Sequence, residues 1–268
     1  MDSITRENDA YNLSFDYNVP YSFNHNVCKL YICGVAAMMK TSCCKKLKFL
    51  NYNVAFHDFA EQVDIISDFS KKSSDPFLQM MYTLKVITQT NKYPNKMCIF
   101  DRSPITDWWY YIIFNILPKV KAIEIKHNKI QALETLAFEQ LSEFLFPMHS
   151  DEIITQKQIL GMELTSKYRT IFIYPDYSYS DTVLQKMKMR QNGLDILTED
   201  YVLAQTAVFK VLHEKFNNIK NFIFYKIEGV PELYSDYNLN NIVSFIRYEF
   251  KNIAQLEYIK SIANFKYV

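Results

Sequence analysis

Residues 31–46, YICGVAAMMKTSCCKK, decide the fold. An apolar run ends at Gly34, and Lys40 and Thr41 follow after a short loop. This order predicts a buried strand, a loop and a helix, a unit in which backbone N–H groups cradle phosphates while a lysine supplies positive charge. Such loops carry a second glycine directly before the lysine, and here that position is Met39. We expect the Met39 side chain to obstruct the approach of a phosphate, so that no ATP binds.

Strand and helix signals alternate along the rest of the chain. We predict strands at 29–35, 53–59, 96–100, 169–176 and 221–227, and helices at 41–50, 75–90, 105–117, 120–146, 151–167, 181–191, 198–216 and 236–262. Short strands that alternate with longer helices are typical of a parallel sheet with helices on its faces. We therefore expect a predominantly helical α/β chain with a small parallel sheet wrapped by helices.

Residues 1–27 lack clear periodicity and predict an extended N-terminal arm before a domain at 28–268. The arm is too apolar for a solvated tail, because it carries Tyr11, Phe15, Tyr17, Tyr21 and Phe23. We expect these aromatic side chains to pack on a second copy of the chain, since exchange of an identical segment is a low-cost route to assembly. The alternative is an arm that lies along its own helices.

Composition limits the classes of function. The formal net charge is +1, which does not call for nucleic acid or an anionic membrane as a partner. No apolar run reaches the roughly 18 residues that a membrane span needs. The first residues lack the order of a signal peptide, so we expect a chain that stays inside the cell.

The chain has five cysteines and no CxxC spacing, so we predict no metal site. Buried free thiols are one reading of these residues. The other is a disulfide to another chain, for which the candidates are Cys28, next to the arm, and Cys43 or Cys44, at what we expect to be the exposed start of a helix.

Two further motifs carry charged side chains. Asp101 and Arg102 follow a predicted strand, at the sheet edge where ligands bind in α/β folds. The acid suits metal or base chemistry and the arginine suits phosphate, although a helix cap with a surface ion pair is the alternative. One predicted helix carries three basic residues, Lys186, Lys188 and Arg190. They could close over phosphates as a lid, or they could form a solvated basic face.

The loop at 34–41, the Asp101-Arg102 pair and the basic helix at 181–191 follow one another in the order found in the deoxynucleoside kinase family, which the chain resembles. The viral thymidine kinase branch is the most similar, and the resemblance covers roughly residues 29–230. The resemblance implies a phosphate loop at Gly34, Lys40 and Thr41, with the last two meeting phosphates and Mg²⁺. It implies that Asp101 and Arg102 hold metal and the acceptor end of the nucleoside. It also implies a lid arginine at Arg190 and a catalytic carboxylate at Asp58 or Glu61.

The departures from the family pattern predict a vestigial site. Met39 replaces a glycine, the segment HDFAEQ at 57–62 lacks the family's Glu-Pro, and the lid has a single arginine. Phosphoryl transfer depends on positioning and electrostatics, so each loss is severe. We therefore expect no catalytic residues, no bound cofactor and no metal.

The chain also resembles the polyhedrins, the occlusion-body proteins of nudiviruses, through its composition and helical character rather than a diagnostic motif. It has only 4 glycines, with 20 tyrosines and 20 phenylalanines, and a net charge near zero favours association. This resemblance implies a crystalline matrix of copies of the chain around virions in the host nucleus. The alternatives are a viral deoxynucleoside (thymidine) kinase that uses ATP and Mg²⁺, and a regulatory protein that binds nucleotide without transfer.

Overall fold

The computed structural model describes residues 29–56, 97–104, 106–120, 123, 126–145, 168–190, 195–219 and 221–265. The arm at 1–27, Cys28, Asp58 and Glu61 lie outside the described residues. The predicted helices at 75–90 and 151–167 lie outside them as well.

A parallel β-sheet forms the centre of the described structure. Its strands are β1 (Lys29–Gly34), β2 (Val54–Phe56), β3 (Cys98–Asp101), β4 (Tyr168–Pro175) and β5 (Phe222–Ile227). They are ordered β2-β3-β1-β4-β5, and every pair is parallel. Each strand overlaps a predicted strand, although β2 ends three residues earlier and β3 begins two residues later than predicted. The α/β class and the small parallel sheet are therefore confirmed.

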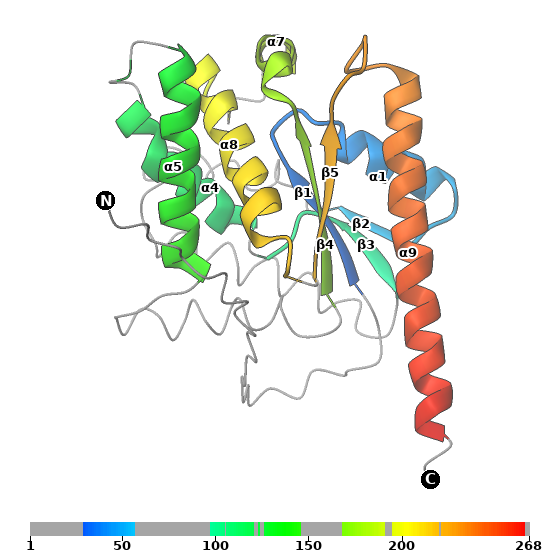
Figure 1. Cartoon of the computed structure of the whole chain (residues 1–268). Helices are drawn as coiled ribbons and strands as arrows, with labels where there is room; N and C mark the ends of the chain where they lie inside the picture. The colour runs from blue at the N-terminus through cyan, green and yellow to red at the C-terminus, as the bar shows by residue number, and fades with distance from the viewer. Residues whose placement is uncertain are drawn as a thin grey trace, which may run out of the picture.

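Helices cover both faces of this sheet. The described helical elements are α1 (Lys40–Phe49), α4 (Thr106–Val120), α5 (Lys126–Leu145), the short η2 (Tyr177–Tyr179), α7 (Ser180–Arg190), α8 (Glu199–Phe216) and α9 (Asp236–Phe265). Figure 1 shows α4, α5 and α8 on one face, α1 and α9 on the other, and α7 beyond the carboxyl ends of β4 and β5. No helix in the described part of the chain combines the length and apolarity that a membrane crossing requires.

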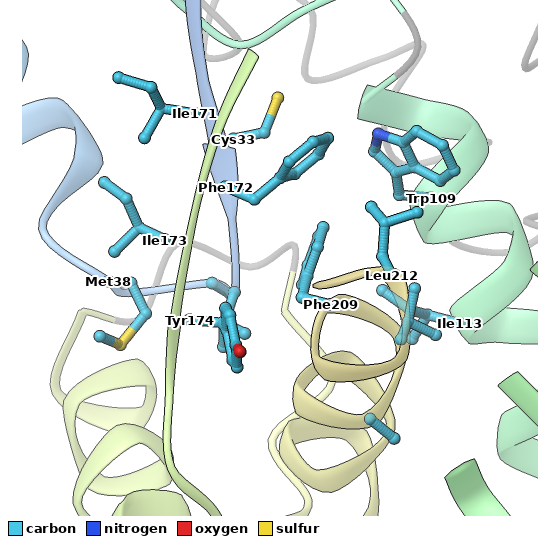
Figure 2. Close-up of a cluster of buried hydrophobic side chains, with 14 of the residues drawn as sticks. Cys33, Met38, Trp109, Ile113, Ile171, Phe172, Ile173, Tyr174, Phe209 and Leu212 are labelled. Atoms are coloured by element: carbon cyan, nitrogen blue, oxygen red, sulfur yellow. The ribbon is translucent and has the colours of Figure 1, made fainter. Parts of the chain in front are cut away.

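The core explains much of the aromatic content. On β4, Ile171 and Ile173 point to one side of the strand and Phe172 points to the other (Figure 2). The Phe172 ring lies 5.9 Å from that of Trp109 on α4 and 5.8 Å from that of Phe209 on α8, measured between centroids. Alternation along a strand thus supplies apolar side chains to helices on both faces.

Side-chain hydrogen bonds fix the start of α8 and the segment before α7 near the carboxyl edge of the sheet. Thr198 caps α8 as predicted, because its hydroxyl accepts a hydrogen bond from the Tyr201 N–H. The Tyr179 hydroxyl donates to the Val230 carbonyl at 2.7 Å and accepts from the Val230 N–H at 2.8 Å. These two bonds join the segment before α7 to the loop after β5.

Candidate phosphate-binding site

The loop between β1 and α1 begins at a glycine that no other residue can replace without strain. Gly34 has φ of 130°, and a Cβ atom at this position would lie 1.9 Å from the carbonyl oxygen of Ile173. The next residue, Val35, donates its N–H to that same oxygen at 3.1 Å. The close approach of two backbones therefore positions the start of the loop against β4.

Met39 occupies the position where such loops carry a glycine, and it adopts a left-handed backbone conformation. Its φ is 51° and its ψ is 10°, and it stands directly before the first residue of α1. Left-handed backbone costs a non-glycine residue roughly 1–2 kcal/mol, and Ala37 bears the same cost at φ of 59°. The side chain of Met39 packs against the apolar core. The shape of the loop thus forms without the second glycine.

The N-terminus of α1 opens onto this loop with its backbone donors available. The first N–H groups of any helix lack partners within the helix, and Met39 provides no side-chain cap. The first turn of α1 carries no acidic residue. Its N–H groups and helix dipole therefore favour an anion such as phosphate.

Lys40 adds a buried positive charge to the loop. The side chain is 9% exposed, and its ammonium donates hydrogen bonds to the carbonyls of Gly34, at 3.1 Å, and Val35. Burial, and then the charge of Arg102, lower the pKa of Lys40 to about 8, while Asp101 acts in the opposite direction. Lys40 is therefore mostly protonated at neutral pH and can attract phosphate.

Thr41 and Asp101 meet although 60 residues separate them in the chain. The Thr41 hydroxyl donates to a carboxylate oxygen of Asp101 at 2.8 Å. The register of β1 against β3 sets this contact, because Asp101 lies beside Ile32. Two hard oxygen ligands next to a phosphate site fit Mg²⁺, which uses one or two protein carboxylates together with substrate phosphates. Within the described ranges no group of three or more His, Cys, Asp or Glu side chains is arranged to hold a metal alone.

Arg102 follows Asp101 with a strained backbone. Its φ is 97°, and its N–H donates to the Ile32 carbonyl at 3.0 Å. A non-glycine residue with such a φ costs about 1–3 kcal/mol, and residues of this kind cluster at functional sites. Asp101 thus contacts the first turn of α1 through Thr41, and Arg102 is anchored to β1.

The basic residues of α7 have different surroundings. Arg190 forms an ion pair with Asp195, and its charge contributes to the lowered pKa of Lys40 after burial and Arg102. The Lys186 ammonium lies 5.2 Å from the ring centroid of Tyr234, and Lys188 is exposed. Arg190 is thus the member of this set that acts electrostatically on the loop.

Two site residues escaped the sequence analysis. The Tyr110 hydroxyl, on α4, donates to the Gly34 carbonyl at 3.4 Å. The side-chain oxygen of Gln205, on α8, accepts from the Ala36 N–H at 2.8 Å. A glutamine within an otherwise apolar stretch of a helix was the available signal for the second.

The expectation that Cys43 and Cys44 lie at an exposed start of a helix is wrong, and their burial argues against a disulfide to another chain. Both thiols are fully buried, and neither forms a disulfide in the described structure. Helix α1 contacts both the sheet and α9, which buries adjacent positions on two of its sides. Burial, and then the Asp101 carboxylate, raise the pKa of Cys43 to about 12, so its thiol is unreactive near neutral pH.

Comparisons with known proteins give a distant relative. No protein-family model matches the chain. The chain is 26% identical, over 191 residues, to an uncharacterized 33.9 kDa protein in the PE 3′ region of Lymantria dispar multicapsid nuclear polyhedrosis virus. The match covers 70% of this chain and 55% of that protein, so the chain spans about half the length of the relative. The two proteins are distant homologues.

Solved structures with a similar arrangement include those of a deoxyadenosine kinase. Deoxyadenosine kinase from M. mycoides with bound dATP has a TM-score of 0.49 and 15% identity, with 82% of this chain and 99% of that chain covered. The same enzyme with dCMP and a flexible dCDP has a TM-score of 0.48 and 16% identity, with 84% and 99% covered. At these identities the likeness concerns the α/β fold alone.

Proposed function

We propose that the chain is a phosphotransferase that moves the γ-phosphoryl group of ATP to the hydroxyl of a deoxynucleoside. One observation carries this proposal: Thr41 donates to Asp101 at 2.8 Å, directly beside the buried Lys40 and the open N-terminus of α1. A purely structural chain has no need for a buried lysine beside strained backbone. Both features suit a site that positions and neutralises phosphate.

The donor phosphates bind at the N-terminus of α1 in this proposal. Backbone N–H groups there contact phosphate oxygens, and the Lys40 ammonium exchanges the carbonyls of Gly34 and Val35 for the nucleotide. Thr41 and Asp101 would hold Mg²⁺, which supplies charge neutralisation when it is bound. Arg102 and Arg190 add positive charge on the side of the loop where the transferred group develops charge.

The acceptor approaches from the side of β2 and β3. Asp58 and Glu61 follow β2 in the sequence, and β2 pairs with β3, whose last residue is Asp101. We assign the role of base to one of these two carboxylates. It takes the proton of the nucleoside hydroxyl while that oxygen forms a bond to the γ-phosphorus, the bond from phosphorus to the bridging oxygen breaks, and ADP leaves.

A transfer assay tests this proposal. The purified full chain is incubated with Mg²⁺ and ATP labelled at the γ-phosphate, together with each of the four deoxynucleosides. We expect a labelled monophosphate with at least one of them, and a loss of at least about a hundredfold in Asp101→Asn and Lys40→Met. Lys45→Met is the matched control, because Lys45 is an exposed lysine on the same helix. Nucleotide binding without transfer to any deoxynucleoside would favour the regulatory alternative.

The occlusion-body role stays a second prediction. Large apolar side chains on the surface support it, since Phe49 is 85% exposed, Tyr237 71% and Tyr248 62%. The buried thiols of Cys43 and Cys44 weigh against a lattice that these cysteines cross-link. Expression in insect cells separates the two roles, because a matrix protein forms crystals in the nucleus that dissolve in alkali. A protein that stays in solution in those cells would remove this candidate.

A further inference from the structure

Gln205 is a fully buried polar residue in the buried middle part of α8. Its neighbours along α8 include Leu203, Ala204 and Ala207, which are buried as well. The Gln205 oxygen accepts from the Ala36 N–H at 2.8 Å, and its side-chain amide donates to the Tyr201 carbonyl at 3.3 Å. Burying an amide is costly unless it is hydrogen-bonded, and Gln205 uses both ends of its amide here.

This contact holds the middle of the phosphate loop. Ala36 lies between the glycine that starts the loop and the left-handed residues Ala37 and Met39. Val35 anchors the same loop to β4 through the Ile173 carbonyl, and Ala36 anchors it to α8. A loop that must keep two non-glycine residues left-handed needs surroundings that determine its shape. Gln205 supplies one of these constraints from a different element.

The segment 195–205 also reaches the lid arginine. Asp195 at its start pairs with Arg190, and Asp200 pairs with Lys129 of α5 at 2.9 Å. One continuous stretch thus contacts the lid cation at one end and the phosphate loop at the other. A shift of α8 would therefore change the position of both.

We infer that Gln205 is a positioning residue for the phosphate loop, which it joins to the helix that follows the lid arginine. The inference rests on the proposed function, because it assigns Gln205 to the binding of the triphosphate donor and not of the acceptor. Without the Gln205 oxygen, the Ala36 N–H loses its partner and the loop departs from the shape that aligns its other N–H groups. Donor affinity then falls while the acceptor side is unchanged.

Three variants of the full chain test this role. Gln205→Met keeps the length of the side chain and removes the acceptor. Gln205→Glu retains an oxygen that accepts from the Ala36 N–H in either protonation state. Leu212→Ala, a buried site two turns further along α8, destabilises the helix without touching the loop contact.

The first readout is amide hydrogen exchange at Ala36, measured by NMR without nucleotide. We expect exchange to accelerate at least about tenfold in Gln205→Met, with protection retained in Gln205→Glu and Leu212→Ala. The second readout is the dissociation constant for MgATP together with the KM for the accepted deoxynucleoside. We expect the first to rise about tenfold in Gln205→Met while the second stays within about twofold.

Each outcome has one meaning. Equal losses in Gln205→Met and Leu212→Ala would overturn the inference, because helix stability alone would then explain both. Unchanged exchange at Ala36 in Gln205→Met would also overturn it. If the wild type binds no ATP, the proposed function fails and the role of Gln205 in donor binding fails with it, whereas a weakened donor affinity in Gln205→Met alone supports both.

Discussion

Replacing Lys40 with methionine should change how stability depends on pH, because Lys40 is buried as a cation. Burial, followed by the charge of Arg102, lowers its pKa from the ordinary value of 10.5 to about 8. Between these two values the unfolded chain binds more protons than the folded chain. The free energy of unfolding of the wild type therefore gains a contribution that rises with pH over this interval.

The size of this contribution follows from the two pKa values. Each unit is worth about 1.4 kcal/mol, so the protonated lysine destabilises the folded chain by about 3 kcal/mol at neutral pH, and about 2 kcal/mol of this is relieved by pH 9.5. Lys40→Met has no titrating group there. The difference in free energy of unfolding between wild type and variant should therefore change by about 2 kcal/mol between pH 7 and pH 9.5, in favour of the wild type.

Urea unfolding followed by tryptophan fluorescence measures this difference. Trp108 and Trp109 are both buried in α4 and report on the core. The variant should fold, because the Gly34 carbonyl keeps the Tyr110 hydroxyl as a donor. Lys45→Met, at an exposed site, should show the pH dependence of the wild type. An identical pH dependence in the wild type and Lys40→Met would refute the reasoning that Lys40 is a buried cation.

Three further predictions follow from backbone strain and burial. Gly34→Ala should lower the free energy of unfolding by at least about 3 kcal/mol, because its Cβ would lie 1.9 Å from the Ile173 carbonyl oxygen. A thermal melt like that of the wild type would contradict the loop geometry. Arg102→Gly should leave the free energy of unfolding unchanged or raise it by about 1 kcal/mol, because φ of 97° suits glycine, while transfer activity is lost. A clearly lower melting temperature would speak against strain at this residue. The thiols of Cys43 and Cys44 should not react with iodoacetamide until the chain unfolds, and mass spectrometry would measure their alkylation. Rapid labelling of the native chain would mean that they are not buried.

Much of the fold was predictable because its elements carry strong local signals. The apolar run at β1 is fully buried, and so is β4 from Thr170 to Pro175; such runs are a clear signal of strands in a parallel sheet. Thr198 gave the start of α8 through its capping hydroxyl. The carboxyl edge of the sheet followed from the order of strands and helices, so the approach of Asp101 to the phosphate loop was expected as well.

The remainder depends on contacts that no local pattern encodes. The left-handed backbone of Met39 has no sequence signal, since packing around the loop determines it. Cys43 and Cys44 are adjacent in a helix, and both are buried because α1 packs against the sheet as well as α9. Gln205 contacts a residue 169 positions away, so its role required the tertiary structure.

Calorimetric titration of the full chain with MgATP tests the central claim most directly, because the claim is that a loop with Met39 still binds a triphosphate. We predict binding in the micromolar range by the wild type and by Lys45→Met, with at least about tenfold weaker binding by Lys40→Met. Urea unfolding of the same samples establishes that each chain is folded. A folded wild type that binds no MgATP at millimolar concentration would contradict the account, and would favour the view that Met39 closes the loop to phosphate.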